Sequence, residues 1–262
     1  MKKFVILFLM GLLLSSFSTV SALELKGKFA VSGLGTLALP IGDFAKEEEE
    51  GGAAKSGLGF GGNFEYFITD NISIGGSFTY RRFGVKTGDA EEGFGELLEW
   101  MFESDLPGVR ATSDIDAKYE ITSFGVFGKY LFTPSPQVSP YLKFGLGSGK
   151  LKTSVDEFSG HLLYQDKRIP YEGSVDLDDI SKAYVDIGGG ILYQLSENIV
   201  LTGEVLFSRL MTDGADQKFD MEMEGRGAGI QVWGTAEWED KFCDADYMSA
   251  FVGLTVLFGG TK

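Results

Sequence analysis

The only histidine of the chain, His161, follows Ser159 and Gly160. A serine and a histidine can carry out acyl transfer when the imidazole activates the hydroxyl and an acid orients the imidazole. The sequence identifies neither a positioned nucleophile nor an orienting acid for His161. We therefore interpret His161 as a solvated loop residue, and we predict no catalytic residue and no enzymatic activity.

Metal chemistry would have to come from oxygen ligands, because the chain has a single cysteine, Cys243. A lone thiol excludes an intramolecular disulfide and a cysteine-based metal cluster. Two groups of aspartates could supply oxygen to Ca²⁺, but neither follows the EF-hand spacing. We predict no metal and no cofactor, and whether the acidic stretches bind Ca²⁺ stays open. The two groups are Asp176, Asp178 and Asp179, and Asp213, Asp216 and Asp220.

Composition points to strands rather than helices as the elements that position these side chains. The chain has 262 residues, with 37 Gly, 22 Phe and 10 Tyr but only 6 Pro, which favours an all-β protein. Its formal net charge is −15, and phosphate binding needs a basic surface. We therefore expect no nucleic acid partner.

Eight segments of 12 to 16 residues alternate apolar and small or polar side chains, as half-buried strands do. Short and long connections alternate strictly between them, which is typical of a membrane barrel with tight periplasmic turns and extended outside loops. The sequence predicts an eight-stranded antiparallel up-and-down transmembrane β-barrel with four long extracellular loops. The segments are 26–39, 57–68, 72–86, 117–132, 140–153, 182–195, 199–212 and 247–258; the long connections are 40–56, 87–116, 154–181 and 213–246.

Alternation alone does not say which face of each segment points inward. A lipocalin-like barrel would place the apolar face inside, but an eight-stranded barrel is only wide enough for side chains to fill it. Small and charged residues suit that lumen, and aromatic residues suit lipid. Because buried charges must be paired, we predict a salt-bridge network that plugs the lumen. The predicted members are Lys28, Glu65, Arg81, Lys129, Lys143, Asp186 and Glu204.

The first 22 residues have the three parts of a secretory signal peptide. Lys2 and Lys3 precede an apolar run from Phe4 to Leu14, and small residues end at Ala22. The apolar run is shorter than the roughly 18 residues of a spanning helix. We predict a signal peptide over 1–22 and an outer-membrane β-barrel domain over 23–262.

Three stretches resemble the superfamily of small outer-membrane β-barrels, which includes the transmembrane domain of outer-membrane protein A, the opacity-type adhesins and the outer-membrane protein W group. They are 29–44, 128–147 and 251–258. The resemblance implies an outer-membrane location in a Gram-negative cell, contact with lipid and lipopolysaccharide, and recognition by the barrel-assembly machinery. In the last stretch Gly253, Val256 and Phe258 match the C-terminal assembly signal.

The long connections contain 31 of the 38 acidic residues, so we expect an anionic outside surface. In the second connection the spacing of Phe94, Leu97, Leu98, Met101 and Phe102 predicts a short amphipathic helix. Its apolar face could pack on neighbouring loops, lie at the membrane surface, or line an entry site for a hydrophobic molecule. Packing on the loops is the interpretation we favour.

The fourth connection alternates Phe219, Met221 and Met223, turns through glycines, and continues with Ile230 and Val232. This pattern predicts a hairpin above the membrane. If the hairpin entered the bilayer, the barrel would have ten strands, as in the omptin proteases.

Three classes of function follow, in this order. The first is a structural or surface-interaction barrel that binds an extracellular ligand. The second is a narrow porin-like conduit for small hydrophobic or ionic solutes, and the third is an outer-membrane lipid hydrolase.

Overall fold

Antiparallel strands make up most of the protein. The computed structural model describes residues 24–47, 51–132, 138–227 and 229–259, so the predicted signal peptide over 1–22 lies outside the described residues. None of the described helices is long and apolar enough to cross a membrane. The strands are β1 (Lys28–Pro40), β2 (Ala54–Phe67), β3 (Ile72–Val85), β4 (Arg110–Leu131), β5 (Val138–Tyr164), β6 (Lys167–Leu177), β7 (Ile180–Gln194), β8 (Ile199–Leu210), β9 (Ala215–Gly227), β10 (Ile230–Phe242) and β11 (Ala245–Gly259).

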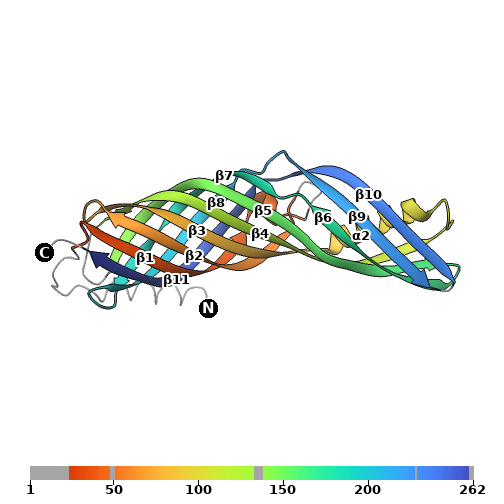
Figure 1. Cartoon of the computed structure of the whole chain (residues 1–262), viewed down its shortest axis with the longest axis horizontal. Coiled ribbons are helices and arrows are strands. Elements are labelled where there is room, and N and C mark those ends of the chain that lie inside the picture. Colours follow the sequence, from red (N-terminus) through yellow and green to blue (C-terminus); the bar gives the residue numbers. More distant parts are fainter. Residues whose placement is uncertain (1–23, 48–50, 133–137, 228, 260–262) are drawn as a thin grey trace.

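Eight of these strands pair in a closed cycle. The order is β1, β2, β3, β4, β5, β7, β8 and β11, and β11 pairs with β1 again (Figure 1). Each predicted segment lies largely within one of these eight strands, because successive side chains of a strand point to opposite faces and the two faces of the ring differ in environment. We call these eight strands the ring.

The prediction of only eight strands was wrong, because the described part of the chain has eleven. β4 and β5 continue well beyond the ring, where β5 pairs with β6, β6 with β9, and β9 with β10. We call this sheet, together with helix α2 (Gly88–Phe102), the extension. It projects from one end of the ring along the long axis of the molecule (Figure 1). The connections 154–181 and 213–246 are therefore largely strand, not loop.

The hairpin β9–β10 does not enter the ring. β8 pairs directly with β7 and with β11, which leaves no place for two further strands between them. The described pairings thus exclude the ten-stranded arrangement that we considered from the sequence.

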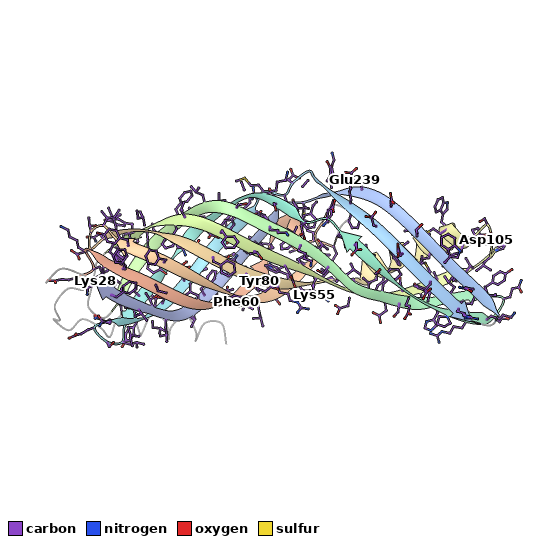
Figure 2. All side chains as sticks on the ribbon, in the orientation of Figure 1. Lys28, Lys55, Phe60, Tyr80, Asp105 and Glu239 are labelled. Atoms are coloured by element: carbon purple, nitrogen blue, oxygen red, sulfur yellow. The ribbon has the colours of Figure 1, made fainter. Side chains whose placement is uncertain are left out.

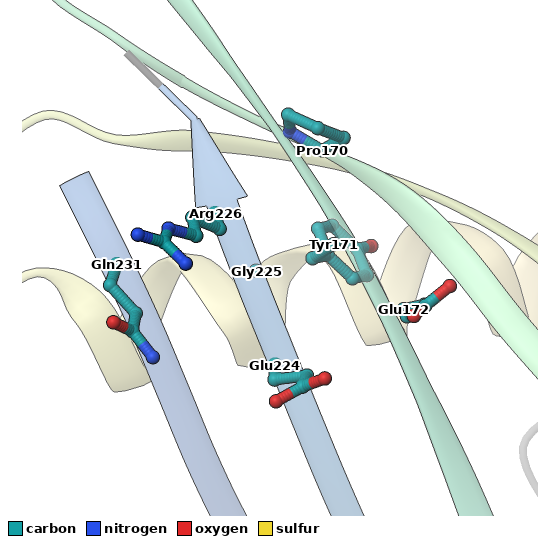
Figure 3. Close-up of a pocket in the computed structure, with 7 residues that line it drawn as sticks. All are labelled: Pro170, Tyr171, Glu172, Glu224, Gly225, Arg226 and Gln231. Atoms are coloured by element: carbon teal, nitrogen blue, oxygen red, sulfur yellow. The ribbon is translucent and has the colours of Figure 1, made fainter. Parts of the chain in front are cut away.

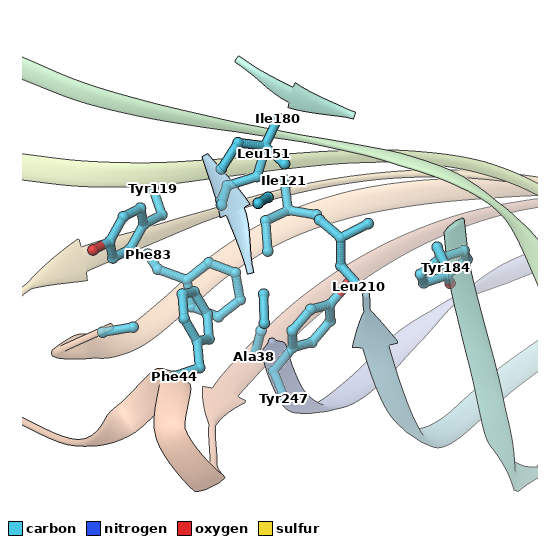
Figure 4. Packing of buried hydrophobic residues seen from close by; sticks show 13 residues of the cluster. Ala38, Phe44, Phe83, Tyr119, Ile121, Leu151, Ile180, Tyr184, Leu210 and Tyr247 are labelled. Carbon is cyan, nitrogen blue, oxygen red and sulfur yellow. The ribbon is translucent and has the colours of Figure 1, made fainter. Parts of the chain in front are cut away.

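The inward side chains of the ring form layers that recur in the same order along its strands. At the end with the short turns lies an apolar layer that includes Phe67, Tyr141 and Leu257. A layer of charged residues follows, then a small apolar group formed by Leu34, Leu206 and Phe251. At the end nearest the extension, a larger apolar cluster fills the mouth of the ring (Figure 4). We call this last cluster the lid; its fully buried members include Ala38, Phe44, Phe83, Ile121, Leu151, Leu210 and Tyr247.

Phe44 reaches the lid from a short 3-10 helix, η1 (Gly42–Ala45), which follows β1. Its ring lies 5.4 Å from that of Phe83 and 5.4 Å from that of Tyr119, measured between centroids. The first long connection therefore folds inward and helps to close the mouth.

The outward face of the ring is an exposed apolar band. Leu58, Phe124 and Val126 each expose more than 60% of their surface, which would be very unfavourable in water over so large an area. Aromatic rings gather near both ends of this band: Phe29, Tyr66 and Phe258 at one, Phe60 and Tyr80 at the other. Such girdles are typical of strands that cross a bilayer.

We predict that glycine is required at the inward position 147 but not at the outward position 128. A Cβ added at the inward Gly147 would collide with backbone atoms of Phe124 and Gly125, whereas one at the outward Gly128 meets no atom within 4 Å. Gly147→Ala should therefore lower the free energy of unfolding by about 1–3 kcal/mol. Gly128→Ala is the matched control and should change it by less than about 0.5 kcal/mol. Urea unfolding in detergent micelles measures both, and equal effects would contradict the inward assignment.

Candidate functional site

The first buried ion pair of the ring joins β2 to β4 across β3. Lys129 Nζ lies 2.8 Å from Glu65 Oε2, and both side chains are 2% exposed. Ser73 of β3, which lies between them, donates a hydrogen bond to the other oxygen of Glu65. Lys129 Nζ also lies 4.5 Å from the centroid of the Tyr141 ring. Each charge thus has its counter-charge as a direct partner.

A second buried pair joins β5 to β8. Lys143 Nζ lies 2.9 Å from Glu204 Oε1, and the Tyr141 hydroxyl donates to Glu204 Oε2 at 2.8 Å. Lys129 and Lys143 are register partners on β4 and β5. Their repulsion is offset because each lysine has its own carboxylate, and the ring of Phe127 lies within 5.5 Å of both ammonium groups.

Arg81 and Asp186 lie further toward the lid and are held by hydroxyl groups. Arg81 is fully buried and donates to Thr79, Tyr247 and Ser249. Asp186 accepts hydrogen bonds from Tyr184 and Ser208. Among the described residues, neither Arg81 nor Asp186 forms a direct ion pair, and the Nη2 atom of Arg81 has no hydrogen-bond partner.

Lys28, the seventh predicted member, begins β1 at the opposite end of the ring. It is half-buried and forms no ion pair with any residue that the structure describes. The structure thus brings four of the seven predicted residues into two pairs, holds two through hydroxyl groups, and leaves Lys28 apart.

Sequence reasoning missed the tyrosines that complete this interior. Tyr141 and Tyr247 are each at most 2% exposed, and both donate or accept hydrogen bonds with the buried charges. The alternation of faces along a strand could have identified them. Tyr141 is two residues from Lys143, and Tyr247 is two residues from Ser249, so each tyrosine lies on the same inward face as that residue.

The predicted amphipathic helix corresponds to α2. Leu98 is fully buried and Phe102 nearly so, and Phe94 and Met101 pack against the same apolar cluster. This cluster also includes Phe158, Leu162, Ile169, Tyr171, Met221, Met223 and Val232 from β5, β6, β9 and β10. The helix therefore lies against the inner face of the extension sheet, and its apolar face serves as the core of the extension.

An apolar hollow of about 640 Å³ lies between α2 and the lid. Leu97, the fifth residue of the predicted helix face, lines it together with Phe94 of the same helix. An ion pair between Lys86 and Glu47, with an N–O distance of 2.7 Å, lies at its edge. Its other apolar lining includes Ile115, Tyr119, Val155, Phe158, Val175, Leu177 and Phe219.

A second, shallower pocket of about 390 Å³ lies where β6, β9 and β10 run side by side (Figure 3). Glu172 and Glu224 are register partners there, so two carboxylates face the same solvent. Burial raises the pKa of the neighbouring Tyr171 to about 12, and the Tyr171 hydroxyl donates to the carbonyl of Thr112. This phenol is therefore neutral and structural at physiological pH.

The residues first considered for chemistry lie in structural positions. His161 lies within β5 rather than in a loop, which corrects our interpretation, and its Nδ1 is 3.0 Å from Arg168 Nη2. No carboxylate or hydroxyl side chain among the described residues completes a catalytic triad with it. Burial, aided by Asp43 and Asp244, raises the pKa of the Cys243 thiol to about 11, so this thiol is a poor nucleophile at neutral pH.

The three residues that resemble an assembly signal lie on β11, which closes the ring against β1. Val256 and Phe258 point outward and are 48% and 44% exposed. Gly253 points inward, where an added Cβ would collide with the backbone of Gly33 and Leu34.

Comparison with known proteins gives one family. The family described as outer membrane protein beta-barrel domain matches residues 10–232. No curated protein matches the chain. Similar solved structures include OprG from Pseudomonas aeruginosa, with 15% identity over 90% of this chain and 98% of OprG at a TM-score of 0.44. The attachment invasion locus protein Ail of Yersinia pestis has 16% identity over 89% of this chain and 99% of Ail, at 0.40. Neisserial surface protein A has 11% identity over 88% and 98%, at 0.41.

We predict that replacing one partner of the pair Glu65–Lys129 lowers the free energy of unfolding much more than replacing both partners with apolar residues. Lys129→Met should lower the free energy of unfolding by about 3–5 kcal/mol, because it leaves a buried carboxylate without its cation. The double variant Glu65→Leu/Lys129→Met should lose much less than the sum of the two single variants.

The exposed pair Lys150–Asp179 is the matched control. Its N–O distance is 2.5 Å, but its side chains are 54% and 33% exposed, so Lys150→Met should cost less than about 1 kcal/mol. Equilibrium unfolding in micelles measures all four variants. A strictly additive double variant would show that Glu65 and Lys129 are not coupled.

Proposed function

Because the chain belongs to the outer membrane protein beta-barrel domain family, we propose that it is a structural or surface-interaction barrel with a plugged lumen. Family membership and the strand-rich fold place the protein in the outer membrane of a Gram-negative cell. In the proposal, the ring is an eight-stranded up-and-down transmembrane barrel and the extension faces the cell exterior.

The proposed orientation rests on the two unequal ends of the ring. One end has short connections, and in one of them Asp70 accepts hydrogen bonds from the backbone of Leu25 and Lys26. These hydrogen bonds lower the pKa of the Asp70 carboxyl, so it stays ionised at neutral pH. The other end continues into the extension. Outer-membrane barrels have short periplasmic turns and long outside segments, which supports an external extension.

The filled interior of the ring is the observation that carries this function. Two buried ion pairs lie between an apolar layer at one end and the lid at the other. A conduction path would have to break both pairs in a low-dielectric interior, where breaking one is expected to cost several kcal/mol. This supports a plug rather than an open pore.

The extension supports a surface-interaction role. Its outward face exposes Trp233 at 73%, and α2 exposes Trp100 at 78%. Exposed tryptophans are common at the centre of protein interfaces. In this proposal lipid and lipopolysaccharide surround the ring, the barrel-assembly machinery recognises Gly253, Val256 and Phe258 on β11, and the extension binds an extracellular ligand.

Conductance of the purified protein in planar bilayers tests the plug. We expect no steady channel currents from the wild type, because both ion pairs block the lumen. The fourfold variant Glu65→Ala/Lys129→Ala/Lys143→Ala/Glu204→Ala should give brief, small openings rather than steady currents, because it removes both pairs while the lid and the apolar layer at the other end still fill the ring. The variant Lys150→Ala, outside the ring interior, is the control and should stay closed. Large steady currents from the wild type would refute the plug.

The hollow between α2 and the lid favours a second candidate function, the uptake of small hydrophobic solutes. Its volume of about 640 Å³ lies within the usual range of ligand sites, and its lining is mainly apolar. The third class, a lipid hydrolase, has no comparable observation in its favour among the described residues.

Binding of an apolar dye, N-phenyl-1-naphthylamine, tests the hollow. Leu97→Glu should weaken binding about tenfold or more, because a carboxylate in an apolar site must be desolvated. Leu163→Glu is the matched control, since Leu163 is 42% exposed near the tip of β5 and away from the hollow. Equal dye fluorescence with all three proteins would remove this candidate.

A further inference from the structure

Four cations gather on the outward face of the ring where it meets the extension. They are Lys55, Arg82, Lys118 and Lys152, from β2, β3, β4 and β5, and we call them the basic patch. Lys55, Arg82 and Lys152 are exposed and Lys118 is half-buried. In a chain with a formal net charge of −15, such a concentration of positive charge is unexpected.

The register of the strands brings these four residues together. Arg82 is the partner of Glu120, and Glu120 is the partner of Lys152 on the next strand. Lys118 is the partner of Gly84, and the side chain of Lys55 lies over Gly84, 3.6 Å from where its Cβ would be. Among the described residues, the register places the carboxylate of Glu120 between Arg82 and Lys152.

The basic patch lies directly above the apolar band. Tyr80 is two residues from Arg82 on the same outward face, and its ring is 5.4 Å from that of Phe60. Thr122 is the register partner of Tyr80 and Glu120 that of Arg82, so Glu120 lies beside the aromatic girdle. Figure 2 shows Lys55, Tyr80 and Phe60 near the middle of the molecule, with Lys55 on the side nearer the extension.

A group of acidic residues lies beyond the basic patch, on the extension. On the outward face of the extension, Glu172 is the partner of Glu224, and Asp176 is the partner of Asp220, which is also the partner of Glu237. Solubility alone does not require positive charge to gather at the edge of the apolar band and negative charge to gather beyond it. The segregation points to an anionic layer at the height of the basic patch.

We propose that the basic patch binds the phosphate groups of outer-leaflet lipids. This inference rests on the proposed membrane orientation and specifies how the protein contacts the lipids around it. The guanidinium of Arg82 can bind a phosphate through two parallel hydrogen bonds, and the lysines add point charges around it. A phosphate headgroup lies at the boundary between hydrocarbon and water, which is where the four cations lie.

Binding of lipid A to the folded protein in detergent micelles tests the proposal. Native mass spectrometry compares bisphosphorylated lipid A with dephosphorylated lipid A of the same acyl chains. We expect the wild type to prefer the phosphorylated lipid about tenfold or more, as charge-assisted contacts from several cations would give. The triple variant Lys55→Gln/Arg82→Gln/Lys152→Gln should lose this preference.

A matched triple variant in the extension, Lys167→Gln/Lys218→Gln/Arg226→Gln, removes the same charge from exposed positions and should keep the preference. Equal binding of both lipids by the wild type, or equal losses in both triple variants, would overturn the proposal. So would competition by millimolar inorganic phosphate, which would indicate a site for free phosphate. Bilayer conductance is a separate readout, so failure of the plug and failure of the basic patch are distinguishable.

Discussion

Backbone hydrogen bonding in a medium without water is the constraint on which the rest of this structure depends. Each amide and carbonyl group in hydrocarbon must find a partner within the protein, and only helices and closed sheets provide one for every group. The pairings β1–β11 and β5–β7 close the ring. The closed ring has eight strands, and the number of strands sets the diameter of its interior.

The narrow interior then explains the composition of the inward face. Two large inward side chains each lie over a glycine of the neighbouring strand: Phe127 over Gly75, and Tyr141 over Gly190. Four of the buried charged residues lie in two hydrogen-bonded groups, Glu65–Ser73–Lys129 and Tyr141–Glu204–Lys143, and Arg81 and Asp186 are held by hydroxyl groups. The layers thus combine apolar closure at the ends with paired charge in between.

Alternation revealed the ring strands in the sequence because lipid and lumen impose opposite demands on successive residues. The same contrast is weaker in the extension, where one face meets water and the other meets α2. β6 has apolar Ile169, Tyr171 and Val175 at alternate positions, but Pro170 and Gly173 interrupt the pattern, so we interpreted it as loop. The hydroxyl partners of Arg81 come from β3 and β11, which are far apart in the sequence. No local pattern indicates such pairing.

Two acidic residues of α2 have a structural role, because they accept hydrogen bonds from backbone amides of β4. From Arg110 to Ala117, β4 does not pair with β3, so one edge of this part of the strand has no strand partner among the described residues. Glu99 accepts a hydrogen bond from the amide of Ala111, and Glu91 accepts one from that of Ile115. An exposed strand edge invites pairing with other chains, and covering it with a helix removes that risk. The negative charge of the second connection therefore cannot be assigned to ligand binding as a whole, because part of it completes the sheet.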